Sequence, residues 1–408
     1  MSTKNLTADV IIIGGGAAGM MAAAAASALG KAVTVLEPER ECGRKLRITG
    51  KGRCNVTNHC DCPTFLKSVV RNPKFLKSAL YRFTPADTEA WFTDRGVALK
   101  VERGDRVFPA SDKSADIVNA LRRAMDEGGV RVEKARALSV LTENGAVSGV
   151  KTDRGSFFAP SVILCTGGLS YPLTGSTGDG YRMAKMLGHT VVEPVASLIP
   201  LEAGPDCAEL QGLSLRNVTL RAYRGDKLIF EELGEMVFTH FGVSGPLVLS
   251  ASVHMHEKDD YRLSIDLKPG LTPEKLDERL LRDFGENLNR CFKNSLDALL
   301  PQKLIPVIIR RSGIDPECRV NAVTRAQRQT LAELIKHFEL QVTALRPVEE
   351  AIVTAGGIDV SEVNPRTMES RIVPGLFFAG EILDLDGYTG GFNLQIAWST
   401  AVCAANNA

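Results

Sequence analysis

The stretch that decides the fold runs from Asp9 to Glu37 and reads DVIIIGGGAAGMMAAAAASALGKAVTVLE. Residues 9–13 form a short β-branched run, as a buried parallel strand requires, and residues 17–29 are mostly alanine, a strong helix former. Gly30 ends the helix, and residues 32–36 form the second expected strand. Strand, helix and strand within about 30 residues predict a right-handed βαβ unit.

The run GGGAAG in this stretch matches the pattern G-x-G-x-x-G. Gly14 allows the tight turn, Gly16 lets a pyrophosphate approach the backbone, and Gly19 lets the helix lie close to the strand. Ala18 belongs to the first helical turn, whose N–H groups and partial positive charge attract phosphate. Glu37 follows Gly19 by 18 residues, where a carboxylate accepts ribose hydroxyls and repels a 2′-phosphate. These residues predict a bound dinucleotide with a free 2′-hydroxyl.

A second segment, near the C-terminus, indicates FAD rather than a nicotinamide nucleotide. The strand-like run 375–379 is followed by a carboxylate that can bind ribitol hydroxyls, then by a glycine pair and an alanine-rich helix. The N-terminus of that helix can direct its N–H groups at the flavin edge where negative charge develops. The alternative is a strand, a turn and a helix packed for stability. The cofactor residues expected here are Gly380, Glu381, Gly390, Gly391, Asn393 and Leu394.

A third segment combines the strand-like run 161–165 with Thr166, Gly167 and Gly168. Glycine-rich turns let the backbone lie against a flat ring, so we expect these three residues to bind the cofactor as well. Between residues 200 and 346 the pattern changes to alternating apolar and polar residues, which predicts antiparallel strands. The chain is therefore expected to hold a nucleotide-binding domain split by a β-rich insertion.

Residues 43–58 read GRKLRITGKGRCNVTN, and this segment closely resembles the hallmark of the BaiN/YhiN family of bacterial flavoproteins. The resemblance covers the whole chain, including residues 238–246, 354–357 and 367–370. It implies an α/β fold: an FAD-binding Rossmann-like domain of the glutathione-reductase type with an inserted β-barrel domain carrying a small helical subdomain. The expected parts are 1–197 and 347–408 for the FAD domain, 198–346 for the insert, and about 272–312 for the helical subdomain. It also implies that Arg44, Lys45 and Asn55 line the FAD cleft.

The family resemblance implies an FAD-dependent oxidoreductase that reduces an activated C=C bond by hydride transfer from flavin. One branch is associated with conjugated 3-oxo bile-acid steroids, and the other with a uracil ring in ribosomal RNA, which makes dihydrouridine. A flavin-binding regulatory protein without turnover is an alternative of another class. No second G-x-G-x-x-G lies in a strand–helix context, so NAD(P)H is expected only as a transient co-substrate.

The proton donor is the least explicit part of the site. His240 lies in a Thr-His-Phe-Gly turn, while Tyr171 and Tyr388 each lie beside a glycine-rich flavin segment. A structural histidine that binds a backbone carbonyl explains His240 equally well. Cys54, Cys60 and Cys62 lack the C-x4-C spacing of disulfide reductases, and no second ligand pair supports zinc. We therefore expect no metal site, and an unpaired, partly buried thiol at Cys54.

Charge and composition indicate the compartment and the partners. The net charge is +1, but eleven basic residues against two acidic ones between residues 40 and 82 give +9 locally, which suits phosphate, carboxylate or an RNA backbone. Arg319, Arg325, Arg328 and Lys336 add weight for RNA. Nine irregularly spaced cysteines favour a reducing cytoplasm over a disulfide framework. The uncharged run 10–29 contains a glycine turn, which argues against a membrane helix or a signal peptide. The sequence does not indicate an oligomeric state.

Overall fold

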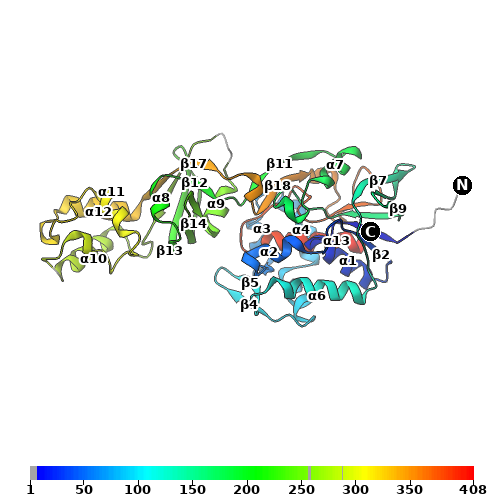
Figure 1. Ribbon diagram of the computed structural model, residues 1–408, viewed down its shortest axis with the longest axis horizontal. Helices are drawn as coiled ribbons and strands as arrows, with labels where there is room; N and C mark the ends of the chain where they lie inside the picture. The colour runs from blue at the N-terminus through cyan, green and yellow to red at the C-terminus, as the bar shows by residue number, and fades with distance from the viewer. Residues whose placement is uncertain (1–6, 256–258, 287) are drawn as a thin grey trace. The chain divides into compact units, whose positions relative to one another are not determined.

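The computed structural model describes residues 7–255, 259–286 and 288–408 and divides into two compact units. The first unit joins residues 1–197 to residues 348–408, and the second comprises residues 198–347. Each unit has its own hydrophobic core, and the two sets of core residues do not overlap. Figure 1 labels the elements of both units and colours them by their position along the chain.

The first unit is built on a five-stranded parallel sheet in the order β19-β10-β1-β2-β6. Its strands are β1 (Val10–Ile13), β2 (Val33–Leu36), β6 (Arg131–Glu133), β10 (Ser161–Leu164) and β19 (Leu376–Phe378). All four residues of both β1 and β2 are buried, as expected for apolar strands that are covered on both faces. The predicted strands at 161–165 and 375–379 are therefore confirmed as members of one sheet with the βαβ unit.

Helices α1 (Ala17–Ala28) and α13 (Phe392–Asn407) pack on this sheet, and α6 (Ser114–Glu127) packs on α1 (Figure 1). The alanines of α1 permit close helix packing, and α1 lies against both α6 and α13. Trp398 of α13 is fully buried and donates its indole N–H to the carbonyl oxygen of Val56 at 2.9 Å. The C-terminal helix is thus part of the core of the first unit.

Smaller sheets and helices complete the first unit. The antiparallel sheets are β3-β5-β4, β7-β8-β9 and β11-β18. Their strands are β3 (Thr57–Asn58), β4 (Leu99–Glu102), β5 (Arg106–Pro109), β7 (Ala137–Glu143), β8 (Ala146–Thr152), β9 (Gly155–Phe158), β11 (Val191–Ser197) and β18 (Val353–Ile358). The further α-helices are α2 (Arg44–Gly52), α3 (Cys62–Lys67), α4 (Pro73–Arg82), α5 (Pro85–Thr93) and α7 (Asp179–Met186). The 3-10 helices are Pro172–Thr174, Val348–Glu350 and Val360–Glu362.

The second unit contains a closed antiparallel barrel in the order β12-β15-β14-β13-β16-β17, in which β17 pairs with β12. Its strands are β12 (Leu201–Ala203), β13 (Ser214–Arg224), β14 (Lys227–Phe238), β15 (Gly242–Ser244), β16 (Tyr261–Asp266) and β17 (Phe338–Leu345). Its helices are α8 (Asp206–Glu209), α9 (Pro246–Ser252), α10 (Pro273–Gly285), α11 (Ile305–Ser312) and α12 (Arg325–Lys336), with 3-10 turns at Phe292–Asn294 and Val320–Ala322. The expected α/β fold with an inserted barrel and helical subdomain is confirmed. The helical part continues past residue 312, because α12 packs on both α10 and α11.

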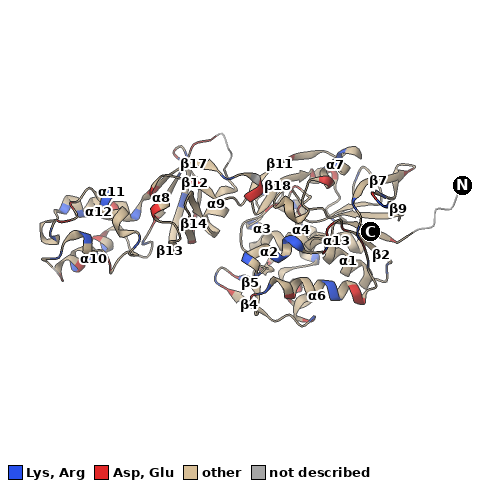
Figure 2. Cartoon of the chain, in the orientation of Figure 1, with Lys and Arg blue, Asp and Glu red and all other residues tan. Residues whose placement is uncertain are grey.

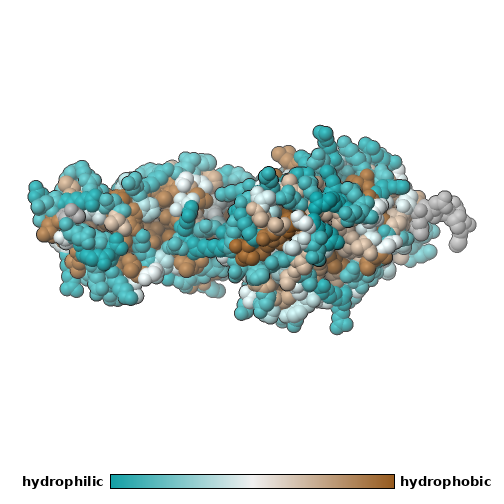
Figure 3. Space-filling model, turned by 90° about the horizontal axis from the view of Figure 1, so that it is seen from below, coloured by the Kyte–Doolittle hydropathy of each residue, from teal (hydrophilic) through white to brown (hydrophobic). Residues whose placement is uncertain are grey.

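Two surface properties complete the description. None of the described helices combines the length and apolar character that a membrane-spanning helix requires. Figure 2 shows basic and acidic residues interspersed along the ribbon. On the face shown in Figure 3, hydrophilic residues predominate, and hydrophobic residues gather in separate groups among them.

Candidate active site

Four neighbouring parallel strands each lead into a segment that the sequence predicts to hold the cofactor. β1 leads into Gly14, β2 into Glu37, β10 into Thr166 and β19 into Gly380. The carboxyl ends of parallel strands meet at one edge of the sheet, which is where open α/β sheets bind nucleotides. The sheet therefore brings together residues that lie more than 300 positions apart, from 14 to 380.

The three motif glycines have different surroundings. Gly14 has a φ of +102°, and a Cβ placed there would lie 2.6 Å from the carbonyl oxygen of Cys165. A Cβ at Gly19 would lie 1.8 Å from the carbonyl oxygen of Gly14, so this glycine permits the contact between helix and strand. A Cβ at Gly16 would meet nothing within 4 Å. Gly16 thus faces open space beside the first turn of α1, where Ala18 and its neighbours have N–H groups without partners inside the helix.

Glu37 is fixed beside this turn by two backbone donors. Its Oε2 accepts from the N–H of Gly15 at 2.7 Å, and its Oε1 accepts from the N–H of Glu39 at 2.9 Å. Burial raises the pKa of the Glu37 carboxyl, although both hydrogen bonds favour the charged form. Arg44, at the start of α2, forms an ion pair with Glu39. Each carboxylate oxygen can accept a second hydrogen bond, so Glu37 still has acceptors to offer a ribose.

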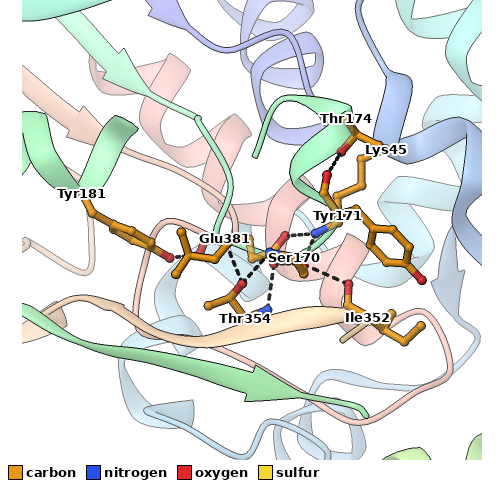
Figure 4. A network of polar contacts seen from close by, with 9 residues as sticks. Lys45, Ser170, Tyr171, Thr174, Tyr181, Ile352, Thr354 and Glu381 are labelled. Carbon is orange, nitrogen blue, oxygen red and sulfur yellow. Dashed lines mark hydrogen bonds and ion pairs between the residues drawn. The ribbon is translucent and has the colours of Figure 1, made fainter. Parts of the chain in front are cut away.

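Glu381, in the segment after β19, lies at the centre of a polar network with residues of α2, α7, β18 and the segment after β10 (Figure 4). Its Oε1 accepts from the N–H of Thr354 at 2.8 Å and from the hydroxyl of Ser170 at 3.1 Å. Its Oε2 binds the ammonium of Lys45 at 2.7 Å, and Lys45 also donates to the Ser170 oxygen at 2.7 Å. Tyr181 donates to the backbone carbonyl of Glu381 at 3.4 Å. The network therefore holds the carboxylate rigidly and leaves Oε2 able to accept one more donor.

The Thr166–Gly168 segment packs tightly against this network. A Cβ at Gly168 would lie 2.4 Å from the Thr354 hydroxyl oxygen, which accepts hydrogen bonds from the N–H groups of Leu169 and Ser170. Gly167 has a φ of +71°, which favours glycine. The hydroxyl oxygen of Thr166 is buried and has no hydrogen-bond partner among the described residues.

The segment containing Asn55 holds the N-terminus of α13. With its amide oriented to satisfy its neighbours, Asn55 accepts from the N–H of Gly391 at 2.9 Å. Asn58 donates to the carbonyl oxygen of Gly390 at 3.1 Å, and a Cβ at Gly391 would lie 2.2 Å from the carbonyl oxygen of Thr57. The expectation that a helix opens near Gly391 is confirmed, and this close contact explains the glycine.

Asn393 and Leu394 lie in the first turn of α13. The Asn393 side chain folds back on the preceding loop: it accepts from the N–H of Gly387 at 3.0 Å and donates to the Gly387 carbonyl oxygen at 2.8 Å. These hydrogen bonds fix the loop that precedes α13, and the binding of the cofactor by Asn393 stays a prediction. Leu394 is half-buried.

The three candidate proton donors fall in different places. Tyr171 has a φ of +53°, is half-buried, and has its pKa raised by burial and by the nearby Glu350 carboxylate. Figure 4 shows its ring on the side of Ser170 away from Tyr181. Tyr388 is half-buried in the loop before α13. His240 belongs to the second unit, where its ring meets that of Phe241 edge-on between β14 and β15.

The cysteines are unpaired. All nine are free, and the described residues contain no group of three or more potential metal ligands. Cys54 is fully buried, which corrects the expectation of a partly buried thiol, and burial raises its pKa to about 12. Burial also raises the pKa of Cys42 to about 11 and that of Cys165. These thiols are protonated near neutral pH and are poor nucleophiles.

FAD fits the donors and spaces at this sheet edge. Gly16 leaves room for a pyrophosphate against the start of α1, and Glu37 has acceptors for the adenosine ribose. The remaining acceptor capacity of Glu381 suits a polyhydroxyl chain such as ribitol. The start of α13, held by Asn55 and Asn58, offers N–H groups to a flavin edge.

Fold and site together define an FAD-dependent oxidoreductase. The chain belongs to the family described as HI0933-like protein Rossmann domain, whose model matches residues 8–407.

Two relatives span nearly the whole chain. It is 32% identical over 384 residues to a ribosomal RNA dihydrouridine synthase of Haemophilus influenzae, covering 92% of each chain. It is 31% identical over 385 residues to a 3-dehydro-bile acid delta(4,6)-reductase of Clostridium scindens, again covering 92% of each. A solved 3-ketosteroid delta1-dehydrogenase from Sterolibacterium denitrificans shares the fold with a TM-score of 0.51, at 14% identity and 98% coverage of each chain.

Sequence reasoning missed several residues that build the site. Ser170 and Thr354 bind Glu381 from 211 and 27 positions away, and Thr57 and Asn58 hold α13. Thr354 and Asn58 lie within segments that carry the family resemblance, which was the one signal available for them. Their partners could not be read from that signal, because the contacts are set by the packing of distant segments.

Proposed function

We propose that this chain reduces a C=C bond conjugated to a carbonyl group in a 3-oxo steroid of the bile-acid type. NAD(P)H, as a transient co-substrate, would reduce the bound FAD, and the reduced flavin would supply the hydride for the β-carbon. The chain's own residues bind and orient the substrate and deliver a proton to the α-carbon. The Clostridium scindens relative, named as a bile-acid reductase, supports this substrate class. The free thiols suit the reducing cytoplasm in which we place the enzyme.

The observation that carries this proposal is that exposed apolar side chains occur in the chain segments next to the Glu381 network. Leu173 is 87% exposed at the tip of a 3-10 turn, three residues from Ser170. Ile352 is 37% exposed, and its carbonyl oxygen accepts from the Ser170 hydroxyl at 3.4 Å. Figure 4 shows the Tyr171 ring and Ile352 on the same side of Ser170. Apolar and aromatic side chains of this kind suit a planar apolar ring system.

Tyr171 is the proton donor that this arrangement favours. Its backbone carbonyl accepts from both the N–H and the hydroxyl of Thr174, at 2.8 and 2.7 Å, so the turn holds the residue in place. The phenol carries a proton at neutral pH, and burial keeps it in that form because it raises the pKa of Tyr171, so the residue has a proton to donate. Tyr388 and His240 remain alternative donors.

A uracil ring of ribosomal RNA is the second candidate substrate, because the Haemophilus influenzae relative is named for that reaction. The basic segment of residues 40–82 supports the binding of RNA less strongly in the structure than its sequence indicated. Five of its eleven basic residues form ion pairs with carboxylates: Arg44, Lys45, Arg47, Arg53 and Arg71. In the second unit Arg328 binds Asp277, while Lys336 is buried against Asp266. Much of this charge is therefore neutralised within the protein.

The test is the reoxidation of reduced enzyme. Photoreduced holoenzyme is mixed anaerobically with a 3-oxo-4,6-diene steroid, with a uracil-containing ribosomal RNA transcript, or with buffer, and flavin absorbance is followed. Faster reoxidation by the steroid, together with a saturated steroid product, is expected. Faster reoxidation by RNA but not by the steroid would identify a uracil ring of ribosomal RNA as the substrate. Equal rates of reoxidation in all three mixtures would contradict both substrates and indicate a flavin-binding protein without turnover.

A further inference from the structure

Asp386, in the loop between β19 and α13, is a buried carboxyl group with an incomplete set of partners. Its side chain is fully buried. Its Oδ2 lies 2.7 Å from the hydroxyl oxygen of Ser197, whereas Oδ1 has no hydrogen-bond partner among the described residues. The Nε of Arg71 lies 3.8 Å from Oδ1, too far for a hydrogen bond. A full negative charge at this position would therefore lack a donor on one oxygen.

The charged groups that face Asp386 do not compensate for this deficit. Arg71, from the segment after α3, also binds the carboxylate of Asp384 at 3.2 Å and is about one-third exposed, with 32% of its side chain accessible. Asp384, on the loop of Asp386 itself, adds a like charge, and Ser197 of β11 is neutral. Burial raises the pKa of Asp386 to about 6, against the opposing effects of Ser197 and Arg71. This environment thus favours the uncharged acid more than water does, and the carboxylate predominates only above a pH of about 6.

The backbone of Asp386 anchors the segment that leads into α13. We call residues 386–391 the cofactor loop, because they include Tyr388 and the glycine pair. The carbonyl oxygen of Asp386 accepts from the N–H of Val70 at 2.8 Å, and the N–H of Tyr388 donates to the carbonyl oxygen of Ser68 at 2.9 Å. Asn393 of α13 also binds Gly387 through two hydrogen bonds. One end of the cofactor loop is thus fixed through Asp386, and the other through Gly390 and Gly391.

We propose that Asp386 is a positioning residue for FAD: its carboxyl group ties the cofactor loop to Ser197 through Oδ2, and ionisation, which leaves a charge on Oδ1 without a donor, shifts the loop and weakens cofactor binding. The inference rests on the proposed binding of FAD at the start of α13. The physical reason is that burying a charged oxygen without a hydrogen-bond donor costs free energy. A movement of the loop that brings this oxygen to water or to Arg71 lowers that cost. The carboxyl group acts through the loop and is not assigned a contact with FAD or substrate.

The test measures FAD dissociation from purified holoenzyme, followed by flavin fluorescence between pH 5.5 and pH 8.0. Wild-type affinity is expected to fall about tenfold or more across this range, because ionisation opposes binding by up to tenfold per pH unit above the pKa. Asp386→Asn carries no charge at either pH, so its affinity is expected to change at least threefold less. Asp226→Asn, an exposed carboxyl in the β13–β14 turn, is the matched control and is expected to follow the wild type.

Ser197→Ala provides an independent variant if Asp386→Asn does not fold. Removing the hydroxyl donor is expected to move the inflection of the affinity profile to higher pH, since Ser197 favours the ionised form. Parallel profiles for wild type and Asp386→Asn, or an unmoved inflection in Ser197→Ala, would overturn the positioning role and leave the proposed reaction intact. Failure of the wild type to hold FAD at any pH would overturn both.

Discussion

Gly16 and Gly19 belong to one motif but have different physical roles. A Cβ at Gly16 meets open space and its φ of −76° suits alanine, whereas a Cβ at Gly19 overlaps the carbonyl oxygen of Gly14. We expect Gly16→Ala to change the free energy of unfolding by less than about 0.5 kcal/mol and to weaken FAD binding about tenfold, because its methyl group occupies the pyrophosphate's space. We expect Gly19→Ala to destabilise the apoprotein by about 3 kcal/mol.

Urea unfolding of the apoproteins and fluorescence titration with FAD separate the two effects. Gly30→Ala, after the end of α1, is a control at a glycine outside the motif. Its φ of +79° is unfavourable for alanine, so this variant is expected to lose stability but to bind FAD as the wild type does. If Gly16→Ala bound FAD as tightly as the wild type, the pyrophosphate would not lie against Gly16.

His189 is a second residue whose burial has a measurable consequence. Its side chain is fully buried, with Nε2 at 2.9 Å from the Ser370 hydroxyl and Nδ1 at 3.1 Å from the Glu362 carboxylate. Burial lowers the pKa of His189, and the Glu362 contact opposes that shift only in part. The folded state therefore keeps the imidazole neutral, while the unfolded chain takes up a proton below a pH of about 6.5.

Acidification should accordingly destabilise the protein through His189. We expect the free energy of unfolding to fall between pH 7.5 and pH 5.5, and to fall less in His189→Gln, which retains hydrogen-bonding groups but does not titrate. Asp386 acts with the opposite sign, because its raised pKa makes the folded state take up a proton as the pH falls through about 6. The wild type and His189→Gln both retain Asp386. The difference between their changes in the free energy of urea unfolding at the two pH values therefore reports the contribution of His189. An equal decrease in both proteins would contradict the assignment.

At the scale of elements, the contact between β3 and α13 connects two distant motifs. The Thr57 hydroxyl donates to the Gln395 amide oxygen at 2.7 Å, and both side chains are fully buried. Thr57→Val should destabilise the protein by about 1–3 kcal/mol, because it leaves a buried acceptor without a donor. Thr57→Ser keeps the hydroxyl and should recover most of this stability in urea unfolding. Equal losses in both variants would attribute the effect to packing of the methyl group instead.

The same elements show why the fold was more predictable than the site. β1, β2, β10 and β19 could be predicted because each is a short apolar run beside a glycine or a carboxylate. The edge strand β6 could not, because Arg131–Glu133 is short and polar and gains its strand conformation by pairing with β2. Glu381 was identifiable from its place after a strand, but its partners Lys45 and Ser170 depend on tertiary packing.

At the scale of the whole molecule, the two units have separate hydrophobic cores, and the predicted FAD residues all lie in the first. Separate cores allow separate unfolding transitions, since each unit buries its own apolar surface. A ligand stabilises only the unit whose folded state binds it. Bound FAD should therefore raise the stability of the first unit and leave that of the second unchanged.

Differential scanning calorimetry of the apoprotein should resolve two transitions. FAD at 100 times its dissociation constant adds about 2.7 kcal/mol to the folded state that binds it. For a unit of this size, we expect the midpoint of the first unit to rise by roughly 5 to 10 °C, while the second stays in place. In Gly16→Ala the same FAD concentration should give a smaller rise, because the affinity is lower. A single transition, or an equal rise of both, would mean that the units unfold together and that FAD stabilises the whole chain.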